Sequence, residues 1–476
     1  MATLDLVESP EVVLIVKRIV TLTGVLLASV SIAASADSLA LVGGRLIDGF
    51  GGPPLEDSVI LISGNRISAV GRQGTLAVPS DAQVIDARGK SVLPGLWEAH
   101  GHLFHVGEAD PGAFQVKFAD QLVPIMEAVA RVTVQAGVTA MRDFCTSCSG
   151  QAAGWNSALL EDQKKLRARI LAGEIPGPRL YFSGPALAPG SGKPGSRYDV
   201  ATVQEATAAT RKLVDAGVDN IFVGSHVWPA PLLDAIVRVA RENKLGVDSE
   251  ARHIAALRGV LDAGVDRVHV FFTADALAGY ADDELRQLVR GVEPSVSGPS
   301  ANILRGPWIL CTLPMRQAYV TAKNFPGLLE HQRLREMFSP EVYRHLQEGW
   351  RAQQTIPWGV GAEERVDVVQ RKLREFIAAG GREQLVAATD AGAPLNFHSP
   401  IPQQLRNLVE AGLTPMEAIQ SATLRAAQMQ GVADQVGTVT AGKLADLVVV
   451  DGDPLQQIEV LQYRVERVIQ NGRLIK

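Results

Sequence analysis

The segment Leu93-Pro-Gly-Leu-Trp-Glu-Ala-His100-Gly-His102 is the most informative part of this chain. Its apolar start is typical of a buried strand, and it ends in two histidines separated by one residue. Residues i and i+2 of a strand share a face and lie about 6–7 Å apart along it. Two such imidazoles can converge on one cation at a bond length of about 2.0–2.1 Å. Far downstream, Val386-Ala-Ala-Thr-Asp390 places a carboxylate in a similar setting. The sequence therefore predicts a hydrolytic metal centre.

Strand-like and helical segments alternate through the middle of the chain. Counting residues 92–103 as the first strand gives about eight strand–helix units, which is the number in a TIM barrel. We therefore predict an α/β protein with a distorted (β/α)8 barrel. In that fold the side chains at the carboxyl ends of strands carry out the chemistry. The further strand-like segments are residues 139–144, 179–184, 220–225, 246–251, 267–272, 309–313 and 385–390.

The two ends of the chain resemble each other. Residues 39–90 contain short runs of β-branched residues between Gly, Asn and Pro, and residues 444–475 contain similar runs. We predict that both ends pair into one small β-sandwich. The expected division is a signal peptide at residues 1–36, sandwich at 37–91, barrel at 92–431, and sandwich again at 432–476.

The first 36 residues have the order of a secretory signal. Lys17-Arg18 precede an apolar run, and Ala34-Ser-Ala36 is a small-residue cleavage site. The run is shorter than the ~20 residues that a spanning helix needs. We expect a periplasmic or secreted protein that leaves the membrane after cleavage; the alternatives are an uncleaved anchor or a start further downstream. In such a compartment Cys145 and Cys148 form a short disulfide or remain two thiols.

Composition limits the partners. The chain has 476 residues, 46% of them hydrophobic, and a net charge of −5, so nothing indicates binding to nucleic acid. We expect a small-molecule substrate and leave a homo-oligomer open. The late strands are separated by a long, charged stretch at residues 274–305 and 315–383. It is either a lid that contacts substrate or a set of solvated helices.

These features together resemble the amidohydrolase superfamily, in particular its imidazolonepropionase-like and prolidase-like branch. The resemblance covers nearly all of the chain after the signal segment. It implies a distorted (β/α)8 barrel that holds one or two divalent metals, and a β-sandwich made from both chain ends. The motifs that carry it are Pro94-Gly-Leu-Trp-Glu-Ala-His-Gly-His102, Ala388-Thr-Asp-Ala-Gly392, Leu413-Thr-Pro-Met-Glu-Ala-Ile419 and Gly437-Thr-Val-Thr-Ala-Gly-Lys-Leu-Ala-Asp-Leu-Val-Val-Val-Asp451.

Three family ligand positions differ here. The bridging lysine of the fourth strand is Phe222, and the histidine of the fifth strand is replaced in Glu250-Ala-Arg252. The histidine position of the sixth strand is Val270, with His269 one residue earlier. A shift of one residue turns a side chain to the opposite face of a strand. We therefore expect His269 to reach the centre only through a β-bulge.

The predicted metal ligands are His100, His102, Glu250 and Asp390. Nitrogen and oxygen donors of this kind are acceptable to Zn²⁺ or Mn²⁺, and we expect Zn²⁺. We expect one ion, with two as the alternative. The competing interpretations are a hydrogen-bonded histidine pair, an Asp390 that caps a helix, and a Glu250 that pairs with a nearby arginine.

Other polar residues are weaker candidates. His226 and His269 are candidates for contact with metal or substrate. Glu98 shares the strand face of the histidine pair and is expected to support it. His105 and His398 are candidates for the pocket wall. Three basic residues are candidates for binding a substrate carboxylate: Arg142, Lys193 and Arg252.

The function that these residues predict is a metal-dependent hydrolase that cleaves an amide, peptide or cyclic amide C–N bond. A metal-activated water attacks, and Asp390 takes its proton. The alternative is a metal-depleted protein of the same fold with a binding or other non-hydrolytic role. This alternative is considered because the family's metal ligands are replaced at Phe222, Glu250 and Val270, and because fold alone does not fix function.

Overall fold

The structure is a computed structural model of the whole chain. It describes residues 38–144, 157–190, 198–224, 226–251, 254–269, 307–324, 332–352, 362–398 and 400–476. The predicted signal segment, both cysteines of the C-x-x-C pair, Lys193, Arg252 and Val270 lie outside these ranges. Within the described ranges, no helix has the length and apolar character needed to cross a bilayer.

One sheet contains strands from both ends of the chain. Its strand order is β18-β17-β16-β5-β1-β2-β3, with β4 beside β1. The join between the two ends is the antiparallel pair β5 and β16, in which Leu93 lies opposite Val448. The prediction that the chain ends pair is therefore confirmed. The strands are β1 (Ser38–Leu46), β2 (Leu55–Ser63), β3 (Arg66–Arg72), β4 (Gln83–Asp86), β5 (Ser91–Pro94), β16 (Leu447–Val450), β17 (Val465–Gln470) and β18 (Arg473–Leu474).

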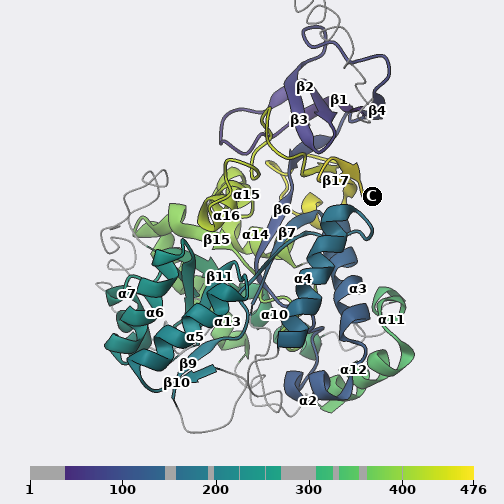
Figure 1. Cartoon of the computed structure of the whole chain (residues 1–476). Helices are drawn as coiled ribbons and strands as arrows, with labels where there is room; N and C mark the ends of the chain where they lie inside the picture. Colours follow the sequence, from purple (N-terminus) through teal and green to yellow (C-terminus); the bar gives the residue numbers. More distant parts are fainter. Residues whose placement is uncertain are drawn as a thin grey trace, which may run out of the picture.

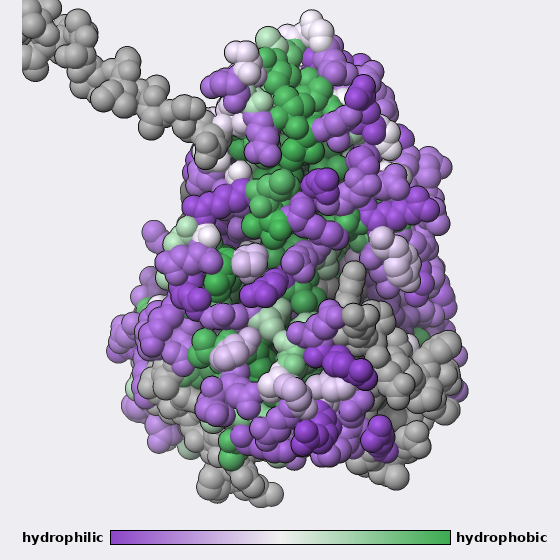
Figure 2. Space-filling model, turned by 90° about the vertical axis from the view of Figure 1, so that its right-hand side faces the viewer, coloured by the Kyte–Doolittle hydropathy of each residue, from purple (hydrophilic) through white to green (hydrophobic). Residues whose placement is uncertain are grey.

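This sheet has its own apolar core. Leu41 and Ile60 from the first part of the chain pack with Leu447 and Val449 from the last part. Figure 1 shows the sheet at one end of the molecule, away from most of the helices. Figure 2 shows a strip of apolar residues along that end, bordered by hydrophilic residues.

The rest of the molecule is built on parallel strands. A three-stranded sheet has the order β6-β7-β8, and a seven-stranded sheet has the order β10-β9-β11-β12-β13-β14-β15. The predicted α/β class is confirmed. The strands are β6 (Leu96–Gly101), β7 (Val138–Asp143), β8 (Arg179–Phe182), β9 (Leu187–Pro189), β10 (Tyr198–Val200), β11 (Asn220–Val223), β12 (Gly246–Glu250), β13 (Arg267–His269), β14 (Trp308–Cys311) and β15 (Leu385–Ala387).

Backbone hydrogen bonds join the two parallel sheets at two places. The Asp219 N–H donates to the Phe182 carbonyl over 2.8 Å, which links the edge strand β8 to the start of β11, the third strand of the larger sheet. The Asp390 N–H donates to the His100 carbonyl, also over 2.8 Å. The end of β6 therefore lies beside the segment that follows β15.

Helices connect the strands, as the apolar periodicity predicted. Helix α5 begins with a capping box between Thr202 and Glu205. The described part of the long charged stretch that separates the late strands contains helices α10 to α13. The helices are α2 (Pro111–Lys117), α3 (Leu122–Gln135), α4 (Ser157–Ala172), α5 (Val203–Asp215), α6 (Ala230–Glu242), α7 (Ile254–Asp262), α10 (Leu313–Asn324), α11 (Gln332–Met337), α12 (Pro340–Ala352), α13 (Ala362–Ala378), α14 (Ile401–Glu410), α15 (Pro415–Ser421), α16 (Leu424–Gln430) and α17 (Val460–Tyr463).

Gly95 lies where the small sheet passes into β6, and its lack of a side chain is a packing requirement. A Cβ there would lie 2.7 Å from the Cβ of Thr139, a buried residue of β7. We expect Gly95→Ala to lower the free energy of unfolding by about 1–3 kcal/mol through overpacking. Urea unfolding measures this. Gly52→Ala is the matched control, because a Cβ there meets nothing within 4 Å. Equal unfolding midpoints for the two variants would contradict the prediction.

Candidate metal centre

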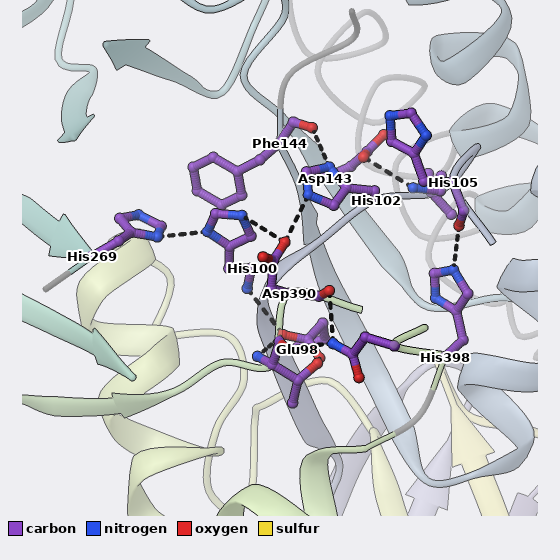
Figure 3. Close-up of polar contacts among 12 residues, drawn as sticks. Glu98, His100, His102, His105, Asp143, Phe144, His269, Asp390 and His398 are labelled. Atoms are coloured by element: carbon purple, nitrogen blue, oxygen red, sulfur yellow. Dashed lines mark hydrogen bonds and ion pairs between the residues drawn. The ribbon is translucent and has the colours of Figure 1, made fainter. Parts of the chain in front are cut away.

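The histidine pair and Asp390 come together at the end of β6. Both imidazole Nε2 atoms face Asp390 Oδ1, at 3.4 Å from His100 and 2.9 Å from His102. The three side chains are buried, and one ligand atom from each lies within 4.8 Å of the others. Figure 3 shows the three side chains pointing toward one another. The structure therefore assembles three of the four predicted ligands.

Local backbone geometry holds Asp390 in place. Its backbone is left-handed, with φ 58°, and the Asn396 amide donates to its carbonyl over 2.8 Å. A Cβ at Gly392 would lie 2.6 Å from the His105 carbonyl oxygen, so glycine lets the two loops touch. Helix α14 begins later and is capped by Pro400. Asp390 is therefore a residue of the site and does not cap that helix.

The hydrogen bonds of His102 require a proton or a cation between its Nε2 and Asp390. Its Nδ1 donates to the Phe144 carbonyl over 2.8 Å, and a carbonyl oxygen only accepts. A neutral His102 therefore has no proton on Nε2, so two acceptors, Nε2 and Asp390 Oδ1, face each other. Either a proton or a cation must lie between them. Burial alone would lower the pKa of His102, but the hydrogen bond and charge of Asp390 raise it to about 9.

The other two members of the group have suitable protonation states. Burial, together with the nearby His269, lowers the pKa of His100 to about 4, so this ring is neutral. Burial would raise the pKa of Asp390, but its close contacts with His100 and His102 hold it well below its usual range. Once His102 has lost the proton that its raised pKa retains, the group offers two neutral imidazoles and a carboxylate, a donor set that Zn²⁺ and similar ions prefer. The residues present fit a divalent metal.

Glu98 ties the histidine strand to the aspartate loop. Its Oε1 accepts from the backbone N–H of His100 and from that of Thr389, each over 3.0 Å. Its other oxygen accepts from the Thr389 hydroxyl. Burial raises the pKa of Glu98 to about 8, although these hydrogen bonds oppose the shift. Its position matches the supporting role that the strand face predicted.

His269 reaches the centre without a bulge. Its Nδ1 lies 2.5 Å from His100 Nδ1, and β13 pairs regularly with both β12 and β14. The expectation that a bulge would be required is therefore wrong. That expectation counted the offset from the family motif, whereas the direction of the side chain is set by the pairing of β13 with its neighbours. His269 contacts the nitrogen of His100 that faces away from Asp390.

Glu250 and His226 do not belong to the group formed by His100, His102 and Asp390. Glu250 ends β12, is buried and pairs with His269 in the sheet. Among the described residues, the group with mutually close ligand atoms contains His100, His102 and Asp390 but not Glu250. His226 is half-buried in the turn after β11. Ligand roles for both stay predictions.

Apolar rings occupy the side of the site where the family carries its lysine. Phe222 packs with Phe144 and Ala186, and the two phenylalanine rings lie 5.2 Å apart. Phe144 also stacks on His100 at a ring distance of 4.4 Å. The sequence reasoning missed Phe144 and its neighbour Asp143, although both lie at a strand end. Attention to every polar or aromatic residue at such ends would have found them.

The remaining candidates lie around this centre. His105 is buried beside His102, with 5.4 Å between the rings, and is bonded to Glu108. His398 contacts the His105 carbonyl oxygen over 2.8 Å. Arg142 pairs with Asp248 in the interior over 2.7 Å, so its guanidinium is engaged there and does not face the solvent.

The chain matches the model of a family described as the amidohydrolase family, over residues 91–475. It is 22% identical over 441 residues to an imidazolonepropionase of Geobacillus sp. (strain WCH70), covering 88% of this chain and 90% of that one. A solved Xaa-Pro dipeptidase with bound methionine has a TM-score of 0.66 at 23% identity, covering 92% and 99%. Phenylurea hydrolase B has a TM-score of 0.70 at 20% identity, covering 92% and 96%. At these identities the structural likeness shows a shared fold.

Metal binding should release protons. Below a pH of about 9 the proton between His102 and Asp390 must leave before a cation can enter. We expect at least about one proton released per ion at pH 7, and an affinity that rises with pH up to about 9. Calorimetry of Zn²⁺ binding in buffers of different ionisation enthalpy measures this. A binding enthalpy independent of the buffer would contradict it.

Substitution of Glu98 should separate hydrogen bonding from charge. Glu98→Ala leaves the buried N–H groups of His100 and Thr389 without an acceptor, which costs about 1–3 kcal/mol of unfolding free energy per group. Glu98→Gln keeps an acceptor oxygen and has the shape of the neutral acid, so we expect a stability near that of the wild type. Thermal unfolding and Zn²⁺ affinity of both variants test this. An alanine variant as stable as the glutamine variant would exclude this role.

Proposed function

The chain belongs to the amidohydrolase family, and on this premise and the site geometry we propose that it is a metal-dependent hydrolase of C–N bonds. The bond would be that of an amide, peptide or cyclic amide. The observation that carries the proposal is the convergence of His100 Nε2, His102 Nε2 and Asp390 Oδ1 on one point. The Nδ1 of His102 is already bonded, so its Nε2 is directed to this point.

We propose that His100, His102 and Asp390 hold one divalent ion, with Zn²⁺ favoured and Glu250 as a further ligand. The apolar packing of Phe222 against Phe144 supports one ion, because that side presents no donor in place of the family's lysine. A bound ion supplies a Lewis acid that polarises the scissile carbonyl and lowers the pKa of its water from ~15.7 to about 7.

Asp390 is the proposed proton carrier. Its Oδ1 faces the histidines, whereas its Oδ2 accepts no hydrogen bond within the described part of the chain. Oδ2 takes the proton of the attacking water and delivers it to the nitrogen of the leaving amine. The amine is the more basic group, so the proton passes on to it from the carboxylate.

We also propose that the parallel strands close into a distorted (β/α)8 barrel. We propose further that the sheet with strands from both ends of the chain is part of a β-sandwich. The support is the series of eight parallel strands β6, β7, β8 and β11 to β15, together with the two backbone hydrogen bonds that join the sheets. The candidate site then lies at the carboxyl ends of the strands, where the chemistry of such barrels occurs. The order of residues 17–36 supports an exported protein.

The substrate class follows from the names of the similar proteins. An imidazolonepropionase, an Xaa-Pro dipeptidase and a phenylurea hydrolase are named for cyclic, peptidic and urea-type substrates. We therefore propose a small molecule with a C–N bond next to a carbonyl. A panel of Xaa-Pro dipeptides, N-acyl amino acids and lactams covers the class, and release of a free amine is the measurement.

Metal content and turnover should fall together. We expect about one ion per chain after loading with Zn²⁺, loss of turnover on chelation, and recovery on readdition. His102→Ala should remove both the ion and turnover. His345→Ala is the control, because His345 is a half-buried residue of α12 that packs against Phe114 and Phe118. Less than about a tenth of an equivalent in the wild type would support the non-hydrolytic alternative.

A further inference from the structure

A line of buried polar contacts extends from His100 away from Asp390 into the interior. His100 Nδ1 lies 2.5 Å from His269 Nδ1. His269 Nε2 lies 3.5 Å from Asp248 Oδ1. All three side chains are almost completely buried. Figure 3 shows His269 on the far side of His100 from His102, with the two Nδ1 atoms facing each other.

Asp248 is the last residue in this series of contacts, and its carboxylate is held in place by several hydrogen bonds. Its Oδ2 accepts from Arg142 over 2.7 Å, from Asn220 over 2.9 Å and from Arg267 over 3.1 Å. Its Oδ1 is left facing His269. Arg267 is itself anchored, because it donates to the Met429 carbonyl over 2.9 Å. Asp248 therefore presents a fixed negative charge to His269, across a 3.5 Å contact that is electrostatic and does not meet hydrogen-bond geometry. The carboxylate cannot turn away without breaking several buried bonds.

The contacts then fix the proton positions in both rings. The negative charge of Asp248 favours the proton of His269 on Nε2, the ring nitrogen that faces it, which leaves His269 Nδ1 as an acceptor. The single proton between the two Nδ1 atoms must then belong to His100. A neutral His100 with its proton on Nδ1 has a bare Nε2, and this is the atom that faces Asp390 Oδ1. The tautomer of His100 is thus set by Asp248, which acts through His269 and does not itself contact His100.

Aromatic rings border this line of contacts. Phe144 stacks on His100 and lies edge-on to His269, with 5.1 Å between the Phe144 and His269 ring centres. Phe222 lies 6.1 Å from the His269 ring. The acceptor that the structure places against the His100 Nδ1 proton is the His269 ring.

We propose that His269 and Asp248 are positioning residues that hold His100 in the tautomer and orientation required to bind the metal. This inference rests on the proposed metal site and adds to it. The sixth-strand histidine does not bind the ion here; it accepts a proton from the ring that does. Partners of this kind orient metal-bound histidines and raise their basicity.

Two substitutions at one position test the proposal. His269→Leu removes the acceptor and keeps an apolar side chain, and we expect it to weaken Zn²⁺ and Co²⁺ binding about 10–100-fold. His269→Asn places an amide oxygen where Nδ1 lies, and we expect it to restore most of the affinity. Calorimetry of each metal alone measures affinity, and thermal unfolding of the metal-free variants measures folding separately. His345→Leu is the matched control on α12 and should bind like the wild type.

The outcomes separate the proposal from its premise. A wild type that binds no metal would contradict the proposed function, whatever the variants do. Two outcomes in a wild type that binds metal would overturn only the positioning role of His269 and Asp248. In one, His269→Leu binds metal as well as the wild type. In the other, His269→Asn loses as much affinity as His269→Leu. If both variants unfold, the Co²⁺-loaded wild type decides by NMR. We expect a paramagnetically shifted, exchangeable Nδ1 proton from each of His100 and His102, and one such proton alone would overturn the proposal.

Discussion

The structure of the site depends on one pairing of backbone segments. The end of β6 and the loop after β15 are joined by the bond from the Asp390 N–H to the His100 carbonyl and by that from the His102 N–H to the Ala391 carbonyl, each 2.8 Å. This pairing places His102 beside Asp390, which is 288 positions away in the sequence. Glu98 and Gly392 reinforce the same join, one by accepting from both segments and the other by allowing them to touch. Without it, the two halves of the donor set have no reason to meet.

Sequence patterns predicted this join because each half carries a local signal. The i, i+2 spacing of His100 and His102 on a strand, and the short strand before Asp390, both place side chains at a carboxyl strand end. The pairing of the chain ends was predicted for a similar reason, since both ends show the same strand and turn composition. These signals concern residues near in sequence, and the parallel topology then brings the segments together.

The contacts of His269 and Asp248, which lie behind the group of His100, His102 and Asp390, could not be predicted from local sequence patterns. The direction of His269 was misjudged, because it depends on the register of β13 against β12 and β14, which no local pattern gives. Asp248 was not considered at all. It is an ordinary strand residue in the sequence, and only the convergence of Arg142, Asn220 and Arg267 from neighbouring strands makes it a fixed acceptor. Such networks arise from several elements at once.

The buried acids around the centre suggest how its charge is balanced. Burial raises the pKa of Glu98 to about 8 and that of Asp143 to about 7, so both are largely or partly protonated near neutral pH. Glu98 contacts the His100 backbone, and Asp143 accepts from the N–H of Leu103, next to His102. A divalent cation close to both carboxyls would favour their ionised forms and oppose the effect of burial. The surroundings of the site would then become more negative as the ion enters, which adds to the protons that binding releases. The ionisable acids on this side of the proposed centre can therefore offset part of the charge of an ion, which the apolar rings of Phe144 and Phe222 cannot do.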